Sequence, residues 1–139
     1  MKTKNEITSW GIRSVSYWMT MLIALGIIFV GIRFIAIPQT AAQAFGIAFS
    51  STQDLVFGRI KGIRDIFSGI VLLPLLLLRM RVATAYVFTV AIIIPATDCL
   101  LVLLTNGLDV PHMLIHGLTA VYMALTSFLL FSAKQKATI

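Results

Sequence analysis

Four long apolar runs, separated by short polar segments, dominate the chain. Each run is about 20 residues long, the length that an α-helix needs to cross roughly 30 Å of hydrocarbon. The pattern therefore predicts four transmembrane helices. We place them at about residues 15–37, 55–78, 82–104 and 112–131.

Composition agrees with this pattern. Of the 139 residues, 59% are hydrophobic and only 12% are charged, and the mean hydropathy is +0.99. A soluble domain of this length could not bury so much apolar surface. We therefore expect an all-α protein, an integral membrane four-helix bundle that forms one domain over residues 1–139. Its first partner would be the lipid bilayer, and it could also assemble with copies of itself.

The longest connection joins the first two runs, from Pro38 to Asp54. Its first part is rich in alanine, and a polar turn, Ser50-Ser51-Thr52, follows. This pattern predicts a short helix at the membrane interface. The last connection carries turn residues, Asn106-Gly107 with Pro111 close behind, as expected between two helices.

The distribution of lysine and arginine predicts the orientation, because cytoplasmic loops are enriched in both. The first and third connections contain neither. The basic residues outside the apolar runs are Lys2, Lys4, Arg13, Arg79, Arg81, Lys134 and Lys136. We therefore expect a multi-pass protein of the cell membrane with both termini in the cytoplasm. The net charge of +6 is mostly this topology signal, and its scatter over separate ends argues against nucleic-acid binding.

A cleaved signal peptide is the alternative interpretation of the first run. Ala42-Gln43-Ala44 has the small-x-small form of a cleavage site. The apolar run is too long for a signal core, however, and it contains Arg33. The single cysteine, Cys99, cannot form an internal disulfide, and we interpret it as a packing residue.

Six ionisable residues lie where hydrocarbon should exclude them. A charged side chain there costs roughly 2.5–3.5 kcal/mol on insertion scales, so such groups usually face the bundle interior. In the expected topology every span contributes at least one of them to the outer half of the membrane. On the second span Lys61, Arg64 and Asp65 also share one helical face. We expect a ligand-binding pocket formed by Arg33, Lys61, Arg64, Asp65, Asp98 and His116.

Plainer roles stay open for each group. Lys61 and Asp65, four residues apart, could neutralise one another, and Arg64 could pair with Asp98 as a structural clamp. Arg33 could be an interfacial anchor and His116 a hydrogen-bonded packing residue. We expect no metal site, because three cations crowd the same region, and no cofactor, because no haem-type cysteine pair or phosphate-binding loop is present.

Several of these residues resemble a known pattern. The chain is similar to an uncharacterised bacterial and fungal family, domain of unknown function 4267, from about Gly26 to Phe131. That family is understood as small four-span membrane proteins, loosely DoxX-like in build, and it implies no established activity. The matching elements are Gly31-Ile32-Arg33, Pro38, Phe45-Gly46, Lys61-Gly62-Ile63-Arg64-Asp65, Gly69, Pro95-x-x-Asp98 and His116-Gly117.

Two classes of function remain. In the first, the pocket binds or converts a lipophilic small molecule such as a quinone, sterol or polyketide. Asp98 and His116 are then the candidate catalytic acid and base, and Arg64 and Lys61 would stabilise an oxyanion. In the second, the protein is a small transporter or an accessory membrane subunit, and the charges form a purely structural ion-pair network. Both an enzyme and a binding protein are compatible with these residues.

Overall fold

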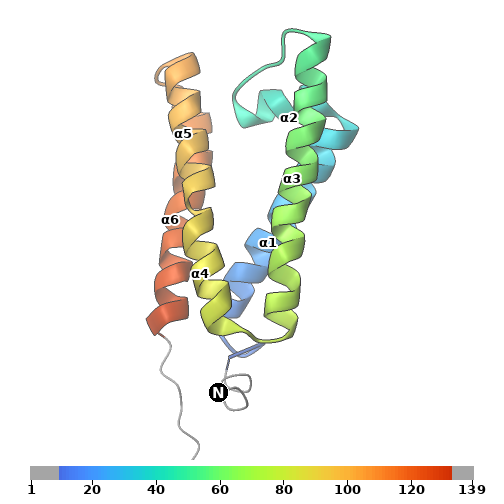
Figure 1. Ribbon diagram of the computed structural model, residues 1–139. Helices are drawn as coiled ribbons and strands as arrows, with labels where there is room; N and C mark the ends of the chain where they lie inside the picture. The colour runs from blue at the N-terminus through green and yellow to red at the C-terminus, as the bar shows by residue number, and fades with distance from the viewer. Residues whose placement is uncertain (1–9, 133–139) are drawn as a thin grey trace, which may run out of the picture.

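The computed structural model describes residues 10–132, which fold into α-helices without a β-strand. This confirms the all-α class. Helices α4 and α5 follow one another along one rod, so that four long rods run side by side (Figure 1). The helices are α1 (Val15–Ala36), α2 (Pro38–Phe45), α3 (Thr52–Leu77), α4 (Arg81–Ala91), α5 (Ile93–Asn106) and α6 (Val110–Ser132).

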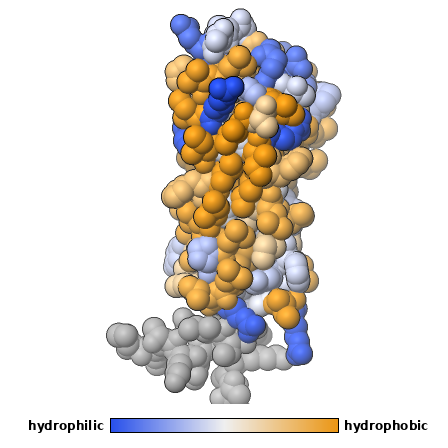
Figure 2. Space-filling view, turned by 90° about the vertical axis from the view of Figure 1, so that its right-hand side faces the viewer, coloured by the Kyte–Doolittle hydropathy of each residue, from blue (hydrophilic) through white to orange (hydrophobic). Residues whose placement is uncertain are grey.

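Three of the rods are long and apolar enough to cross a membrane: α1, the α4–α5 rod and α6. Helix α3 is 26 residues long, but five charged residues lie in its first 14 positions. Large apolar side chains are exposed along all four rods, and they cover most of the face shown in Figure 2 between hydrophilic ends. A soluble protein rarely exposes so much contiguous apolar surface, so the structure supports a membrane protein.

The rods form two pairs, α1 with α3 and the α4–α5 rod with α6. Glycine lets the first pair approach closely. A Cβ atom built on Gly31 would lie 2.5 Å from the carbonyl oxygen of Gly62, and one built on Gly62 would lie 2.6 Å from that of Gly31. One heptad further along α3, a Cβ on Gly69 would lie 2.5 Å from the Ala24 oxygen. Small residues are the usual means of such backbone contact between membrane helices.

The half of the bundle where α1 begins and α6 ends is closely packed, and we call it the packed half (Figure 1). Its core joins both pairs, with Leu76 from α3, Phe88 from α4 and Leu130 from α6 fully buried. The Arg81 guanidinium donates a hydrogen bond to the Leu130 carbonyl. The buried apolar cluster comprises Trp10, Tyr17, Ala24, Leu72, Leu76, Ala85, Phe88, Met123 and Leu130.

The third expected span is interrupted. Helix α4 ends at Ala91 and α5 begins at Ile93. Pro95 explains the break, because proline has no N–H to bond the carbonyl four residues earlier, here that of Ala91. The residues around the break make longer, irregular bonds, from Ile92 N to Thr89 O at 3.3 Å and from Ala96 N to Ile92 O at 3.2 Å. Helices therefore occupy the third apolar run, but the break within it was not expected from the sequence.

The other half of the bundle contains α2, the short helix expected between the first two runs, and we call it the pocket half. The carbonyls at the end of α2 have no partner within the helix, as at every helix end. The second helix pair provides partners: His116 Nε2 donates to the Phe45 oxygen at 2.8 Å, and Asn106 Nδ2 donates to the Gly46 oxygen at 2.5 Å. We call this set of contacts the α2 bridge, because it ties the two helix pairs together.

The backbone at Gly46 is suited to this bridge. Its φ of 104° lies in the left-handed region that glycine tolerates best, and it ends α2. A Cβ atom at this position would lie 2.8 Å from the Cβ of His112. Only glycine therefore lets the end of α2 approach α6 so closely.

Asp109, in the α5–α6 connection, holds one donor of the α2 bridge, Asn106, in place. Its Oδ2 accepts hydrogen bonds from Asn106 Nδ2 at 3.1 Å and His112 Nδ1 at 2.8 Å. These bonds favour the carboxylate, and they lower the pKa of Asp109 below its ordinary value, with the Asn106 amide as the largest cause.

A pH dependence follows from the lowered pKa of Asp109. The stabilisation is fully present above the unfolded pKa of about 3.9, and it is lost as the pH falls through the lower, folded pKa. We expect wild type to unfold at a higher temperature than Asp109→Asn at pH 6, and the gap to close below about pH 3.9. Paired melting curves in detergent test this, since every other acid is common to both proteins. A gap that is constant with pH would contradict it.

Candidate functional site

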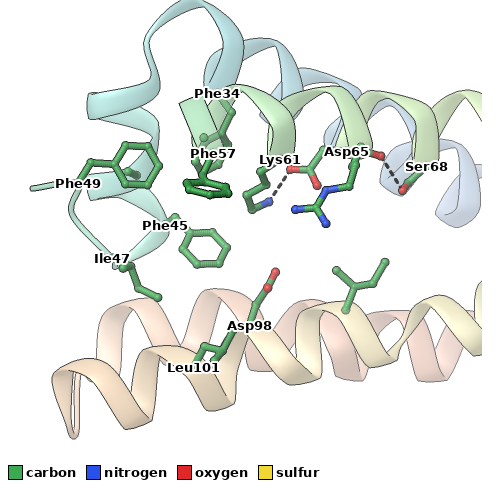
Figure 3. A pocket seen from close by; sticks show the side chains of 14 residues that line it. Phe34, Phe45, Ile47, Phe49, Phe57, Lys61, Asp65, Ser68, Asp98 and Leu101 are labelled. Atoms are coloured by element: carbon green, nitrogen blue, oxygen red, sulfur yellow. Dashed lines mark hydrogen bonds and ion pairs between the residues drawn. The ribbon is translucent and has the colours of Figure 1, made fainter. Parts of the chain in front are cut away.

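A pocket of about 540 Å³ lies between α3 and α5 in the pocket half, with α2 and the segment after it at one end (Figure 3). Its volume is in the range of small-molecule sites. Two kinds of side chain line it. The apolar end has four phenylalanines, and the other has charged groups (Figure 3). The aromatic residues are Phe34, Phe45, Phe49 and Phe57, and the charged residues are Lys61, Arg64, Asp65 and Asp98.

The charged wall comes mainly from one face of α3. Lys61, Arg64, Asp65 and Ser68 are spaced i, i+3, i+4 and i+7, and all four line the pocket. Such spacing places side chains on a single helical face. Arg59, which the periodicity places elsewhere, is exposed and does not line the pocket.

Lys61 is already neutralised within α3. Its Nζ lies 2.5 Å from Oδ2 of Asp65, and Asp65 is buried with 7% of its surface exposed. The same ammonium lies over the rings of Phe34, at 4.7 Å from the centroid, and Phe45, at 5.1 Å. Cation–π contacts of this kind are favourable where water is excluded. Lys61 is thus held by one carboxylate and two aromatic faces.

Arg64 and Asp98 are in a different situation. Both line the pocket, Arg64 from α3 and Asp98 from α5, where the Asp98 carboxylate points across toward α3 (Figure 3). Within residues 10–132 neither side chain makes a hydrogen bond or an ion pair. The ion pairs of this part of the chain are Lys61–Asp65 and Asp109–His112. The Arg64–Asp98 clamp considered from the sequence is therefore not formed.

The two remaining members of the expected cluster lie elsewhere. Arg33 is half-buried in the last turn of α1 and does not line the pocket. His116 is buried in α6, where it bonds the Phe45 carbonyl and lies against the Phe45 ring at 4.5 Å between centroids. Asp98 lines the pocket and His116 does not. Among the described residues, no group of three His, Cys, Asp or Glu is placed to hold a metal.

The pocket lining consequently carries two cations and two carboxylates. In the cluster expected from the sequence, the three cations Arg33, Lys61 and Arg64 outnumber the two carboxylates. With Arg33 outside the lining, the charges of the pocket balance. The net charge of the pocket lining therefore does not by itself favour an anionic ligand.

The aromatic end of the pocket was not anticipated. Phe45 and Phe49 belong to the connection that we treated as interfacial, and they reach the site because α2 folds back onto the bundle. Gly58 makes room for Phe49, since a Cβ atom at Gly58 would lie 2.5 Å from its ring. Four of the nine phenylalanines lie between residues 34 and 57, in or beside the first connection. This clustering was the available signal in the sequence.

His116 has a structural role that can be measured. We expect His116→Ala to lower the free energy of unfolding by about 1–3 kcal/mol, because the half-buried Phe45 carbonyl loses its donor. Chemical denaturation in detergent measures the change. Thr119→Val on the same helix is the control, since its hydroxyl bonds only the Ile115 carbonyl of its own helix. Equal effects of the two substitutions would show that His116 does not hold the bridge.

Comparison with known proteins identifies the family. The model of the family described as "Domain of unknown function (DUF4267)" matches residues 24–130, which is most of the chain. The protein therefore belongs to this family, as the resemblance of its motifs indicated. No curated protein and no solved structure matches the chain.

Proposed function

We propose that this member of the DUF4267 family is a four-span protein of the cell membrane that binds a lipophilic small molecule in the pocket between α3 and α5. One observation carries the proposal: a pocket of about 540 Å³ combines four phenylalanines with two charged side chains that have no partner in the described chain. An apolar pocket with a few convergent polar groups is the usual form of a ligand site.

The surroundings of the pocket support entry from the lipid. Phe57 and Leu101 line the pocket and are also 69% and 45% exposed. They lie on α3 and α5, whose outer surfaces are covered by exposed apolar side chains. A lipophilic molecule could therefore pass sideways between the two helices without crossing water. With cytoplasmic termini, the pocket half would be the outer half of the membrane.

The topology is tested by cysteine labelling in intact cells. After Cys99 is replaced by alanine, we expect Leu108→Cys in the α5–α6 connection to react with a membrane-impermeant maleimide. Met80→Cys, in the α3–α4 connection, should react only after the cells are opened. Both side chains are exposed, so access to the reagent decides the result. Labelling of both positions from outside would contradict four spans.

Ligand binding is tested by photo-crosslinking in proteoliposomes with three diazirine probes. The probes have the same alkyl chain and differ in the headgroup, which is an alcohol, a carboxylic acid or an amine. We expect at least one probe to label α3 or α5 pocket residues saturably, with competition by its unlabelled form. Ser68→Trp should abolish the saturable part because the indole would fill the pocket. The Ser68 hydroxyl bonds only its own helix, to the Arg64 carbonyl, so its loss disturbs little else.

Ile70→Trp is the matched control for this substitution. It adds an indole to the same helix at a side chain that is 50% exposed and does not line the pocket. Saturable labelling should survive it. If none of the three probes labels saturably, or if the two variants behave alike, the pocket is not a binding site for lipophilic molecules.

A second candidate function is favoured by one observation. The Lys61–Asp65 pair is complete within α3, and Lys61 is also covered by two aromatic rings, which suits a structural network. The protein would then be an accessory membrane subunit or a small transporter. Arg64 and Asp98 distinguish the two candidates, because a structural network would be expected to pair them.

A further inference from the structure

Arg64 and Asp98 define what the occupant of the pocket must offer. Arg64 presents a guanidinium, a rigid fork of donors that suits phosphate or carboxylate. Asp98 presents a carboxylate, which accepts hydrogen bonds and attracts a cation. The two side chains come from facing helices and line the same pocket, but they are not within ion-pair distance of one another.

The charges nearby are already satisfied. Asp65 is bound to Lys61 at 2.5 Å, and Lys61 is also held by Phe34 and Phe45. Neither member of this pair is free to neutralise Arg64 or Asp98 fully. One positive and one negative group therefore remain, Arg64 exposed and Asp98 half-buried. The proposed topology surrounds both helices with lipid, where an unpaired charge is costly.

Four kinds of ligand can be compared on this basis. An anionic amphiphile would satisfy Arg64 but would place its charge beside Asp98. A cationic one would satisfy Asp98 and be repelled by Arg64. An uncharged one would leave both side chains unpaired, while a zwitterion would satisfy both. Like-charge contact in an interface costs several kcal/mol, so these differences decide the selectivity.

We propose that the ligand of the pocket is a zwitterionic amphiphile, an inference that rests on the proposed function. Its anionic group, a phosphate or a carboxylate, binds Arg64, its primary ammonium binds Asp98, and its apolar chain lies against the phenylalanines. A phospholipid with an ethanolamine headgroup and a single-chain amino acid amphiphile share this chemistry. Either could enter sideways from the surrounding lipid.

The test compares four ligands on the full-length protein in a non-ionic detergent by native mass spectrometry. Three share two octanoyl chains: phosphatidylethanolamine, phosphatidylglycerol and diacylglycerol. The fourth, 2-aminododecanoic acid, represents the single-chain source. We expect at least one of the two zwitterions to bind about tenfold or more tightly than phosphatidylglycerol and diacylglycerol. The tighter zwitterion identifies the source.

Two charge-removing variants sharpen the result. Asp98→Asn should shift the preference toward phosphatidylglycerol, because the carboxylate that repels an anion is gone. Arg64→Gln should reduce binding of both zwitterions to the level of diacylglycerol. Arg59→Gln is the control, since this arginine of α3 lies outside the pocket lining, and it should change nothing. If a variant fails to fold, the relative affinities of the four ligands for the wild-type protein still test the preference for a zwitterion.

The outcomes separate this inference from the proposal on which it rests. Equal binding of all four ligands, blocked by Ser68→Trp, would overturn the zwitterion and leave the pocket as a lipophilic site. Preference for phosphatidylglycerol in wild type would also overturn it. Binding that Ser68→Trp does not block would overturn both.

Discussion

Asp65→Asn is expected to lower the free energy of unfolding in detergent by about 3–5 kcal/mol, the usual cost of removing one partner of a buried ion pair. Asp65 is 7% exposed and binds Lys61 at 2.5 Å. An amide there leaves the Lys61 ammonium, itself mostly buried, without its counter-charge. Equilibrium unfolding with a denaturing detergent, followed by circular dichroism, measures the loss.

Asp98→Asn is the matched control, because it makes the same chemical change at a carboxylate of the same pocket. Asp98 is half-buried and has no bonded partner among residues 10–132, so its replacement should cost little or even stabilise the protein. The double variant Lys61→Met/Asp65→Leu should recover most of the stability lost in Asp65→Asn, since no charge is left unpaired. Equal losses at Asp65 and Asp98 would instead indicate one continuous structural network.

The helices were predictable because the apolar runs have the length of a membrane span and are separated by turn residues. The four apolar runs are helical, and three of the rods are long and apolar enough to cross a membrane. The break at Ile92 was harder to predict from the sequence, because one proline in an apolar run can either bend a helix or divide it. Pro74 in α3 shows the difference, since it lies within a helix that continues to Leu77.

The charged face of α3 was predictable for a local reason. Lys61, Arg64 and Asp65 belong to one helix, so their spacing alone fixes their common direction. Asp98 lines the same pocket from another helix. Arg33 and His116 were expected at the same depth, but depth does not determine how a helix is rotated about its axis. Tertiary packing decides that, and it directs His116 toward the end of α2.

The α2 bridge could not have been derived from the sequence. It depends on two backbone carbonyls, those of Phe45 and Gly46, which carry no sequence signal of their own. The partners, His116 and Asn106, lie 71 and 60 residues further along the chain. Two of the pocket phenylalanines, Phe45 and Phe49, lie in α2 or just after it, which is why the aromatic end of the site was missed.

The two halves of the bundle differ in how their helices pack. In the packed half, buried residues of α1, α3, α4 and α6 form one apolar cluster. In the pocket half, α1 and α3 still touch through glycine, while Phe45 of α2 and Phe49 just after it line the pocket between α3 and α5. The close contact between α1 and α3 therefore supports the pocket wall from behind.

Gly62→Ala should accordingly be damaging although it adds a single methyl group. The new Cβ would lie 2.6 Å from the Gly31 oxygen and 2.9 Å from Cγ1 of Ile35. A backbone oxygen cannot move aside as a side chain can, so α1 and α3 must separate. We expect a loss of about 3 kcal/mol, the upper part of the usual range for overpacking. Thermal unfolding in detergent measures it, and ligand binding should weaken in parallel because Lys61 and Arg64 lie on the same helix.

Gly26→Ala provides the control with the same change in composition. Gly26 lies in α1, five residues before Gly31, and a Cβ atom there meets nothing within 4 Å. Alanine in a helix interior is favoured over glycine by roughly 0.5–1 kcal/mol, so this variant should be as stable as wild type or slightly more so. The two variants should therefore change stability in opposite directions. If Gly62→Ala is as harmless as Gly26→Ala, α1 and α3 do not contact through their backbones, and the wall of the pocket has another support.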